Sequence, residues 1–267
     1  MDNSAVKIKT LKPFLDDQFA LIQPNLEEFL RDDPVHIPKQ FSKKEDIEIS
    51  AFLTATIAWG QRKTIINNAN KLVELMDHQP HDFIVNHTDS DLKSFEKFVH
   101  RTFNASDLLF FIHRLKRIYT ESTDLESFMI SDKSATDLGQ ILSDFKHHFF
   151  DLDYLPRSTK HVADPLKGST AKRLLMFLRW MVRNDLADFG IWKSLQPAQL
   201  LPPVDVHSAK FARAMGLLDR KQNDWKAVSE LGNNLKSIDS LDPVKYDYVL
   251  YGMGAFSFFR PLSDLRL

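Results

Sequence analysis

The residues best suited to chemistry in this chain lie in the segment LLPPVDVHSAKFARAM, where Asp205 follows a pair of prolines. Pro202 and Pro203 impose an extended backbone, and the apolar spacing beyond Asp205 predicts a helix that begins there. A carboxylate at a helix N-terminus is kept ionised by the helix dipole and the free backbone amides. Such a group can stabilise a developing positive charge or accept a proton. It can also simply cap the helix, and the residue types alone leave both roles open.

Basic side chains gather upstream and downstream of this segment. The whole chain is nearly neutral, with 35 Lys and Arg against 36 Asp and Glu, but residues 157–226 hold 13 basic and 6 acidic side chains. The polar side of the helix predicted over 170–183 carries Lys172, Arg173, Arg179 and Arg183. A local excess of this kind favours an anionic partner such as the phosphates of a nucleic acid. An ordinary solvated surface would give the same charge count.

Composition excludes several other kinds of site. With no cysteine, the chain has no disulfide, no iron–sulfur cluster, no thiolate zinc site and no cysteine nucleophile. The histidines form no HExxH-type pair, and the adjacent His147 and His148 point to different sides of a helix, so no metal site is expected. P-loop, dinucleotide-binding and GxSxG motifs are missing from a sequence that has only 8 glycines. No cofactor is therefore expected.

Helices must position these residues, because the apolar spacing is helical almost throughout. Steps of three and four residues predict an αα-hairpin of two helices on either side of Gly60, with Asp46 capping the first. Further helices are predicted over 92–99, 105–119, 125–130, 136–150, 170–183, 206–216, 224–238 and 243–252. No alternating run longer than four residues indicates a strand. The sequence thus predicts an all-α protein of about ten helices.

The chain is expected to form one compact unit over residues 1–267, with two helical lobes and a cleft between them. One lobe is expected over about 45–150 with adjoining helices, and the other from 1–44 together with 155–267. Proline-containing loops at 154–168 and 194–205 flank the basic helix, where a site would be built. Neither a signal peptide nor an apolar run of membrane-spanning length is seen, so a cytoplasmic protein is expected.

Three segments resemble the helix-hairpin-helix DNA glycosylase superfamily, the endonuclease III-like enzymes. They are, in the family's order, ISAFLTATIAWGQRKTIINNANKL, PVDVHSAKFARAMGL and DPVKYDYVLYGMGAF. The whole sequence is most similar to an uncharacterised bacterial branch (DUF2400-like) marked by KRLLMFLRWMVR, GIWKSLQPAQL and DVH, with some similarity to archaeal 8-oxoguanine glycosylases. The resemblance implies a glycosylase-like fold of two helical lobes and base excision from DNA.

The resemblance also implies roles for single residues. Asp205 matches the family's catalytic Asp, which stabilises positive charge on the sugar and can take a proton from the nucleophile. Gln61 matches the Gln that enters the space left by an extruded base, and His207 would orient a phosphate or the Asp, or simply fill the cleft. By position, Lys172 matches the nucleophile of the bifunctional members, which forms a Schiff base at C1′ of the sugar only as the neutral amine. Lys167 is the competing nucleophile.

Further residues are expected to hold the DNA and the extruded base. The DNA-binding set consists of Gln61, Lys167, Gly168, Arg173, Arg179, Arg183 and His207. Trp192 and Phe256 are candidates for stacking on the base, because an extruded base needs aromatic faces. Packing in the protein core is the alternative explanation for both aromatic side chains.

The sequence departs from the glycosylase family at two points. The glycine-rich hairpin before the Lys is replaced by DPLKGSTAKRLLMFLRW, in which only Gly168 remains, and the C-terminal four-Cys cluster is missing. The interval between Lys172 and Asp205 is longer than in most endonuclease III-like enzymes. It is closer to the interval in the archaeal 8-oxoguanine branch.

The sequence therefore predicts a DNA glycosylase for base excision repair, with lyase activity if Lys172 is the nucleophile. Its partner would be double-stranded DNA that carries a damaged base, with an oxidised purine as the first choice. The alternative is a non-catalytic protein that binds DNA, RNA or a nucleotide on the same fold, which the altered hairpin favours. A catalytic site requires the Lys172 amine and the Asp205 carboxylate to face one cleft within about 10 Å. A Lys172 side chain that points to open solvent would favour binding alone.

Overall fold

The structure is a computed structural model that describes residues 3–31, 33–122, 124–132, 134–185 and 187–264. Helices dominate these ranges, so the all-α prediction is confirmed. The strands in the described part are β1 (Val99–His100) and β2 (Phe103–Asn104), which pair antiparallel in one short hairpin. No helix among these residues is both long enough and apolar enough to cross a membrane.

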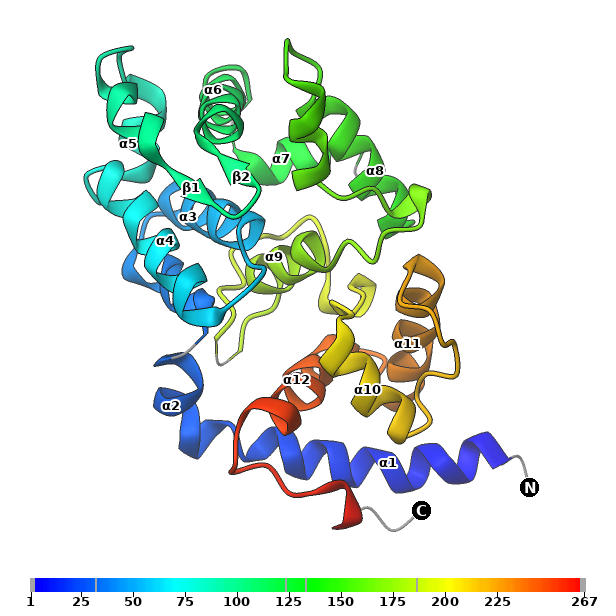
Figure 1. The fold of residues 1–267 in the computed structure, drawn as a ribbon. Helices are drawn as coiled ribbons and strands as arrows, with labels where there is room; N and C mark the ends of the chain where they lie inside the picture. Colours follow the sequence, from blue (N-terminus) through cyan, green and yellow to red (C-terminus); the bar gives the residue numbers. More distant parts are fainter. Residues whose placement is uncertain (1–2, 32, 123, 133, 186, 265–267) are drawn as a thin grey trace.

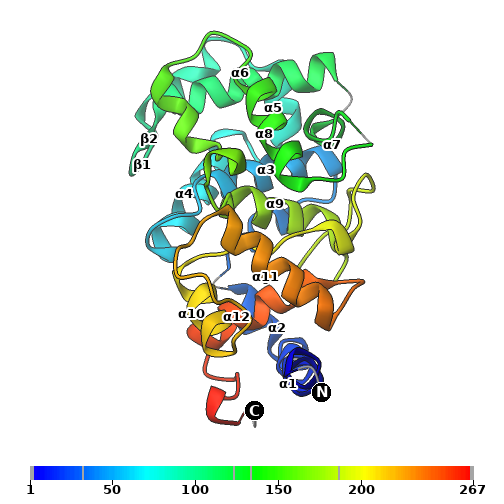
Figure 2. The same cartoon turned by 90° about the vertical axis from the view of Figure 1, so that its right-hand side faces the viewer.

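The α-helices form two groups at opposite ends of the molecule, with one helix between them, as Figure 1 and the turned view in Figure 2 show. The first group consists of α3 (Lys44–Thr56), α4 (Arg62–Leu75), α5 (Pro80–Asn86), α6 (Ala105–Glu121), α7 (Leu125–Met129) and α8 (Leu138–Phe149). The second consists of α1 (Asn3–Ala20), α2 (Leu26–Arg31), α10 (Val206–Ala214), α11 (Trp225–Ile238) and α12 (Asp247–Ala255). Helix α9 (Lys172–Val182) lies between the groups and packs against α3.

Short 3-10 helices occur in the connections between these elements. They are η1 (Gln23–Asn25), η2 (Pro34–His36), η3 (Pro38–Gln40), η4 (Asp91–Lys97), η5 (Pro156–His161), η6 (Pro165–Lys167), η7 (Pro197–Gln199), η8 (Pro243–Tyr246) and η9 (Leu262–Asp264). Most of them begin at a proline, whose fixed φ suits the first position of a helical turn and whose missing N–H would have no partner there. Two of them, η5 and η6, lead the chain from α8 into α9.

Helix α9, with the sequence KRLLMFLRWMV, is the central element, and beyond its first turn it is buried on almost every side. Leu174, Phe177 and Met181 are among its many buried side chains. The helix follows Ala171, whose φ of 47° lies in the left-handed region and marks a sharp turn into the first helical residue. This turn makes Lys172 the first residue of α9, beside residues of α4, α10 and α12.

A cluster of phenylalanine rings joins α9 to the first group of helices. The ring of Phe52 on α3 contacts Phe111 on α6, Phe149 on α8 and Phe177 on α9, with centroids 5.5–5.9 Å apart. Trp192 packs edge-on against Phe177 at 5.2 Å and is only 1% exposed. Its indole N–H donates to Oε1 of the buried Glu48 at 2.7 Å. The expectation that Trp192 stacks on a base is therefore wrong, because its ring packs within the core and its N–H already has a buried acceptor.

Two local predictions differ from the structure. The segment 92–99 was expected to be one helix, but its last residue, Val99, begins β1 and pairs with Asn104 instead. Asp46 does not cap α3, because that helix begins earlier, at Lys44. The Asp46 carboxylate lies inside the first turn and accepts the backbone N–H of His81 at 2.8 Å, so that it connects α3 to α5. Val99 is thus taken up by a tight local hairpin, whereas the partner of Asp46 is 35 residues away in the chain.

Candidate functional site

A pocket of about 280 Å³ lies where α4, α9, α10 and α12 come together. Its wall includes Lys172 and Asp205, together with Gly60 and Arg62 beside the start of α4 and Asp247 at the start of α12. Elements from both groups of helices contribute, so the pocket exists only in the folded chain. The two residues that the sequence singled out for catalysis therefore share one pocket.

Lys172 and Asp205 are in direct contact. The Lys172 Nζ donates to Oδ2 of Asp205 at 2.7 Å, and the Lys172 side chain is 36% exposed. The other carboxylate oxygen, Oδ1, accepts the backbone N–H groups of His207 and Ser208, both at 2.9 Å. Asp205 is thus the N-cap of α10, as predicted, and the capping amides use only one of its two carboxylate oxygens. One oxygen caps the helix, and the other faces the amine.

The surroundings of Asp205 keep its carboxylate ionised. Burial by itself would raise the pKa of Asp205, but the Lys172 ammonium and the amides of Ser208 and His207 outweigh that effect and hold the pKa below its ordinary value. An ionised carboxylate is the species that stabilises a neighbouring cation. Asp205 therefore carries its negative charge at any pH near neutrality.

A second carboxylate in the pocket was not singled out from the sequence. Asp247 lies in the pocket wall, and its Oδ2 accepts a hydrogen bond from Nη1 of the buried Arg179. Burial raises the pKa of Asp247 to about 6; Arg179 opposes this rise, and the Asp205 carboxylate adds to it. The closing segment DPVKYDYVLYG contains this residue, but an Asp at the start of a helix gives no local sign that it faces a pocket built by other helices.

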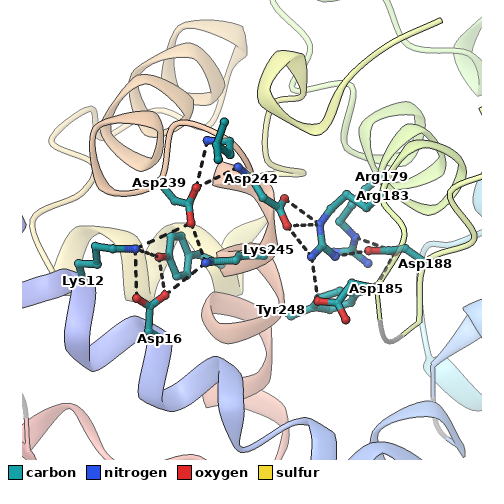
Figure 3. A network of polar contacts seen from close by, with 12 residues as sticks. Lys12, Asp16, Arg179, Arg183, Asp185, Asp188, Asp239, Asp242, Lys245 and Tyr248 are labelled. Carbon is teal, nitrogen blue, oxygen red and sulfur yellow. Dashed lines mark hydrogen bonds and ion pairs between the residues drawn. The ribbon is translucent and has the colours of Figure 1, made fainter. Parts of the chain in front are cut away.

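Arg179 and Arg183 occupy the protein interior. Figure 3 shows both side chains among carboxylates, and their exposed fractions are 4% and 1%. Arg183 donates to Asp242 at 2.8 Å and also pairs with Asp188, whose other oxygen accepts the Tyr248 hydroxyl at 2.6 Å. The expectation that Arg179 and Arg183 contact DNA phosphates is therefore wrong. A buried guanidinium is tolerated only with close acidic partners, and these partners leave it out of reach of a duplex.

This burial predicts a large stability effect. Arg183→Ala leaves Asp188 buried without one of its cationic partners, so we expect the free energy of unfolding to fall by about 3–5 kcal/mol. Arg117 is the matched control, because its side chain is 48% exposed and its partner Glu121 is 57% exposed. Arg117→Ala should cost at most about 0.5 kcal/mol. Urea denaturation followed by circular dichroism measures both changes, and similar losses in the two variants would contradict the prediction.

A basic groove of about 550 Å³ adjoins the pocket and shares Gly60 and Lys172 with it. Its basic side chains are Lys146, Lys160, Lys167, Lys172 and Arg173, and these five residues define the basic groove below. Lys167 is exposed over 77% of its side chain. The sequence pointed to Lys167 and Arg173, but Lys146 on α8 joins them only because η6 packs against α8. The groove therefore offers a positively charged surface directly beside the Lys172–Asp205 pair.

Three other residues predicted to bind DNA, Gln61, His207 and Gly168, differ in whether they belong to the pocket wall. Gln61 is exposed and is the N-cap residue of α4, between the pocket residues Gly60 and Arg62. His207 is exposed and belongs to the pocket wall. Gly168 ends η6 with a φ of 86°, at a position with open space around it.

Phe256, the other aromatic residue assigned to the base pocket, packs against Phe29 at a centroid distance of 5.1 Å and is not part of the pocket wall. The pocket wall contains a different contact to an aromatic residue. Arg62 on α4 donates to the hydroxyl of Tyr251 on α12, and both side chains belong to the wall. Among the described residues, no group of three His, Asp or Glu side chains is placed to hold a metal ion.

Comparison with known proteins adds the family but no activity. Residues 33–256 match the model of a family described as a protein of unknown function, DUF2400. The matched range includes the Lys172–Asp205 pair, Asp247 and the whole basic groove. No curated protein and no solved structure matches the chain.

Proposed function

The chain belongs to the DUF2400 family, and we propose that it is a DNA glycosylase of the helix-hairpin-helix type, which removes a damaged base from double-stranded DNA. One observation carries this proposal. An amine and an ionised carboxylate, 2.7 Å apart, share a pocket that opens beside a groove with five basic side chains. The family description supplies no function, so the proposal rests on this geometry and on the resemblance of the three sequence segments.

The pair suits the chemistry of glycosidic bond cleavage. When the bond between C1′ and the base breaks, its electron pair leaves with the base and positive charge develops on the sugar. The Asp205 carboxylate stabilises that charge. Lys172 is charged while it pairs with Asp205, so it must release one proton to solvent before its neutral amine attacks C1′. Attack followed by opening of the sugar ring then gives a Schiff base, which makes strand cleavage possible.

The size of the pocket supports an extruded base. A volume of about 280 Å³ lies near the lower end of small-molecule sites, and a continuous duplex cannot enter it. The target nucleotide would therefore rotate out of the helix to reach Lys172. Trp59 and Tyr251, which are both partly exposed, lie in the wall and provide aromatic surface for the base. Gln61 lies between the wall residues Gly60 and Arg62, and in this proposal it enters the gap that the base leaves.

The basic groove supplies the contacts to the phosphates. Lys172 is paired with Asp205, so the other basic side chains of the groove neutralise roughly four phosphates. The logarithm of the binding constant should then fall with the logarithm of salt concentration with a slope of about −4. Reversing two exposed charges, Lys160→Glu and Lys167→Glu, should flatten that slope by about two units and weaken all sequences alike. Fluorescence anisotropy with a labelled duplex at several salt concentrations measures this. Lys93→Glu with Lys97→Glu, on η4 outside the groove, is the control. An equal response of both pairs would contradict a duplex in the basic groove.

The decisive test of the proposed function is a gel assay on a panel of duplexes, each with one damaged base. Excision leaves an abasic site that alkali converts into a strand break, and we expect such breaks for at least one oxidised purine. Tight binding without release of any base would contradict the glycosylase proposal. That outcome would support the non-catalytic alternative, a protein that recognises nucleic acid on the same fold.

A further inference from the structure

The pocket brings a second carboxylate to the reacting centre. Asp247 begins α12, and Lys172 and Asp205 come from α9 and the start of α10, yet all three side chains line the same wall. The Asp247 side chain is almost wholly buried, and Arg179 fixes its orientation through Oδ2. A carboxyl group that is held in place at the wall of a small pocket is within reach of whatever fills that pocket.

We propose that Asp247 is a further catalytic residue, the general acid that protonates the base as it leaves the sugar. This inference rests on the proposed glycosylase function and gives Asp205 and Asp247 separate tasks. Asp205 stabilises the sugar cation, and Asp247 neutralises the charge that would otherwise build up on the departing base. The substrate class is then a base that leaves poorly as an anion and carries an acceptor atom for this proton.

The charges that face Asp247 make the division of tasks physically consistent. They are Arg179 and Lys172 on α9, Asp188 in the loop after α9, and Asp205 at the start of α10. Burial and the two carboxylates favour the protonated form of Asp247, and the two cations favour the ionised form. The balance leaves the pKa of Asp247 at about 6, while the pKa of Asp205 lies below its ordinary value. When the pKa values of two carboxyl groups in one site are pushed apart, the group with the higher pKa can act as a general acid. The group with the lower pKa stays ionised and can stabilise a cation.

The Asp247 carboxyl gives its proton to the base, and the electron pair of the C1′–N bond leaves with the base. A bond then forms between C1′ and the nucleophile, which is either water or the neutral amine of Lys172. The nucleophile loses one proton as this bond forms, and that proton restores the Asp247 carboxyl.

The test compares Asp247→Asn with Asp188→Asn. Asp188 is the matched control because it is a buried carboxylate that also faces Arg179, at 3.6 Å, but lies outside the pocket wall. Asp247→Asn should lower the single-turnover rate of base excision about 100-fold or more, and Asp188→Asn should leave it within a few-fold. The affinity for a duplex that already carries an abasic site should be unchanged in Asp247→Asn, because that complex contains no base to protonate.

The pH dependence provides a second, independent readout. A general acid works in its protonated form, so the ratio of the wild-type excision rate to that of Asp247→Asn should be largest below pH 6. Above that value the ratio should fall about tenfold per pH unit, because the protonated fraction of Asp247 falls by that factor. The titrations of the other groups are common to both proteins and cancel in the ratio. A ratio that does not change with pH would overturn the inference.

The outcomes separate this inference from the proposed function. Wild-type protein that releases no base from any duplex overturns the glycosylase proposal itself. Wild-type protein that excises, with Asp247→Asn equally fast, overturns only the role of Asp247. Loss of abasic-site affinity in Asp247→Asn, or an equal loss of excision in Asp188→Asn, would show that Asp247 is a structural residue and would overturn the inference as well.

Discussion

Replacing Asp205 with Asn should remove base excision from a protein that remains folded. The Asn side chain has nearly the same shape, and its carbonyl oxygen can still accept the backbone N–H groups of His207 and Ser208 at the start of α10. What it lacks is the negative charge beside the sugar. Loss of such electrostatic stabilisation lowers the rate of the chemical step by about 10²–10³-fold. Single-turnover excision measures this loss, and urea denaturation checks the fold.

The chain offers a matched control for that variant. Asp224 is the N-cap of α11, accepts the backbone N–H of Ala227 and pairs with Arg220, so it has the same local role as Asp205. It lies outside the pocket wall. Asp224→Asn should therefore excise at the wild-type rate, although it removes the same charge from the same kind of helix end. An Asp205→Asn variant as active as Asp224→Asn would show that Asp205 only caps its helix.

A covalent adduct between protein and DNA should be trapped by borohydride in the wild type and should disappear in Lys172→Gln. Borohydride reduces a Schiff base to a stable amine, so the trap reports directly on an amine nucleophile. We expect the trapped fraction to fall to background, because Gln has no amine and the described residues of the pocket wall include no other lysine. Denaturing gel electrophoresis of the trapped complex measures the effect.

Lys167→Gln is the control for the nucleophile. Lys167 lies in the basic groove but outside the pocket wall, so this variant should still be trapped. Trapping that persists in Lys172→Gln and disappears in Lys167→Gln would move the nucleophile to Lys167. Excision by the wild type without any trapped adduct would show that water attacks C1′. Lys172 would then serve only as the ion-pair partner of Asp205.

Much of the local structure could be predicted from the sequence. The apolar periodicity of KRLLMFLRWMV predicts α9, and the proline pair followed by Asp205 predicts the start of α10 with its capping carboxylate. These features depend on residues within one or two helical turns, so the sequence contains all of the information that decides them. The same holds for the overall helical class, since nearly every segment shows the same spacing.

The assignment of charged and aromatic residues to the site was less predictable. Arg173 and Arg179 lie on one helix, yet the first belongs to the basic groove and the second is enclosed by carboxylates. Helical periodicity shows that a residue is on the polar side of a helix. It does not show whether that side meets water or the acidic residues of another helix, because the partners Asp242 and Asp247 are far away in sequence.

The sequence by itself determined that the protein is helical, where the basic segment lies and which carboxylate begins α10. Only the tertiary structure decided that Lys172 contacts that carboxylate, that Lys146 joins the basic groove and that Asp247 faces the same pocket. The physical reason is the range of the interactions. Helix formation and capping depend on neighbours in the chain, whereas a pocket and its charges are set by which helix ends pack together, and burial then determines which side chains stay ionised.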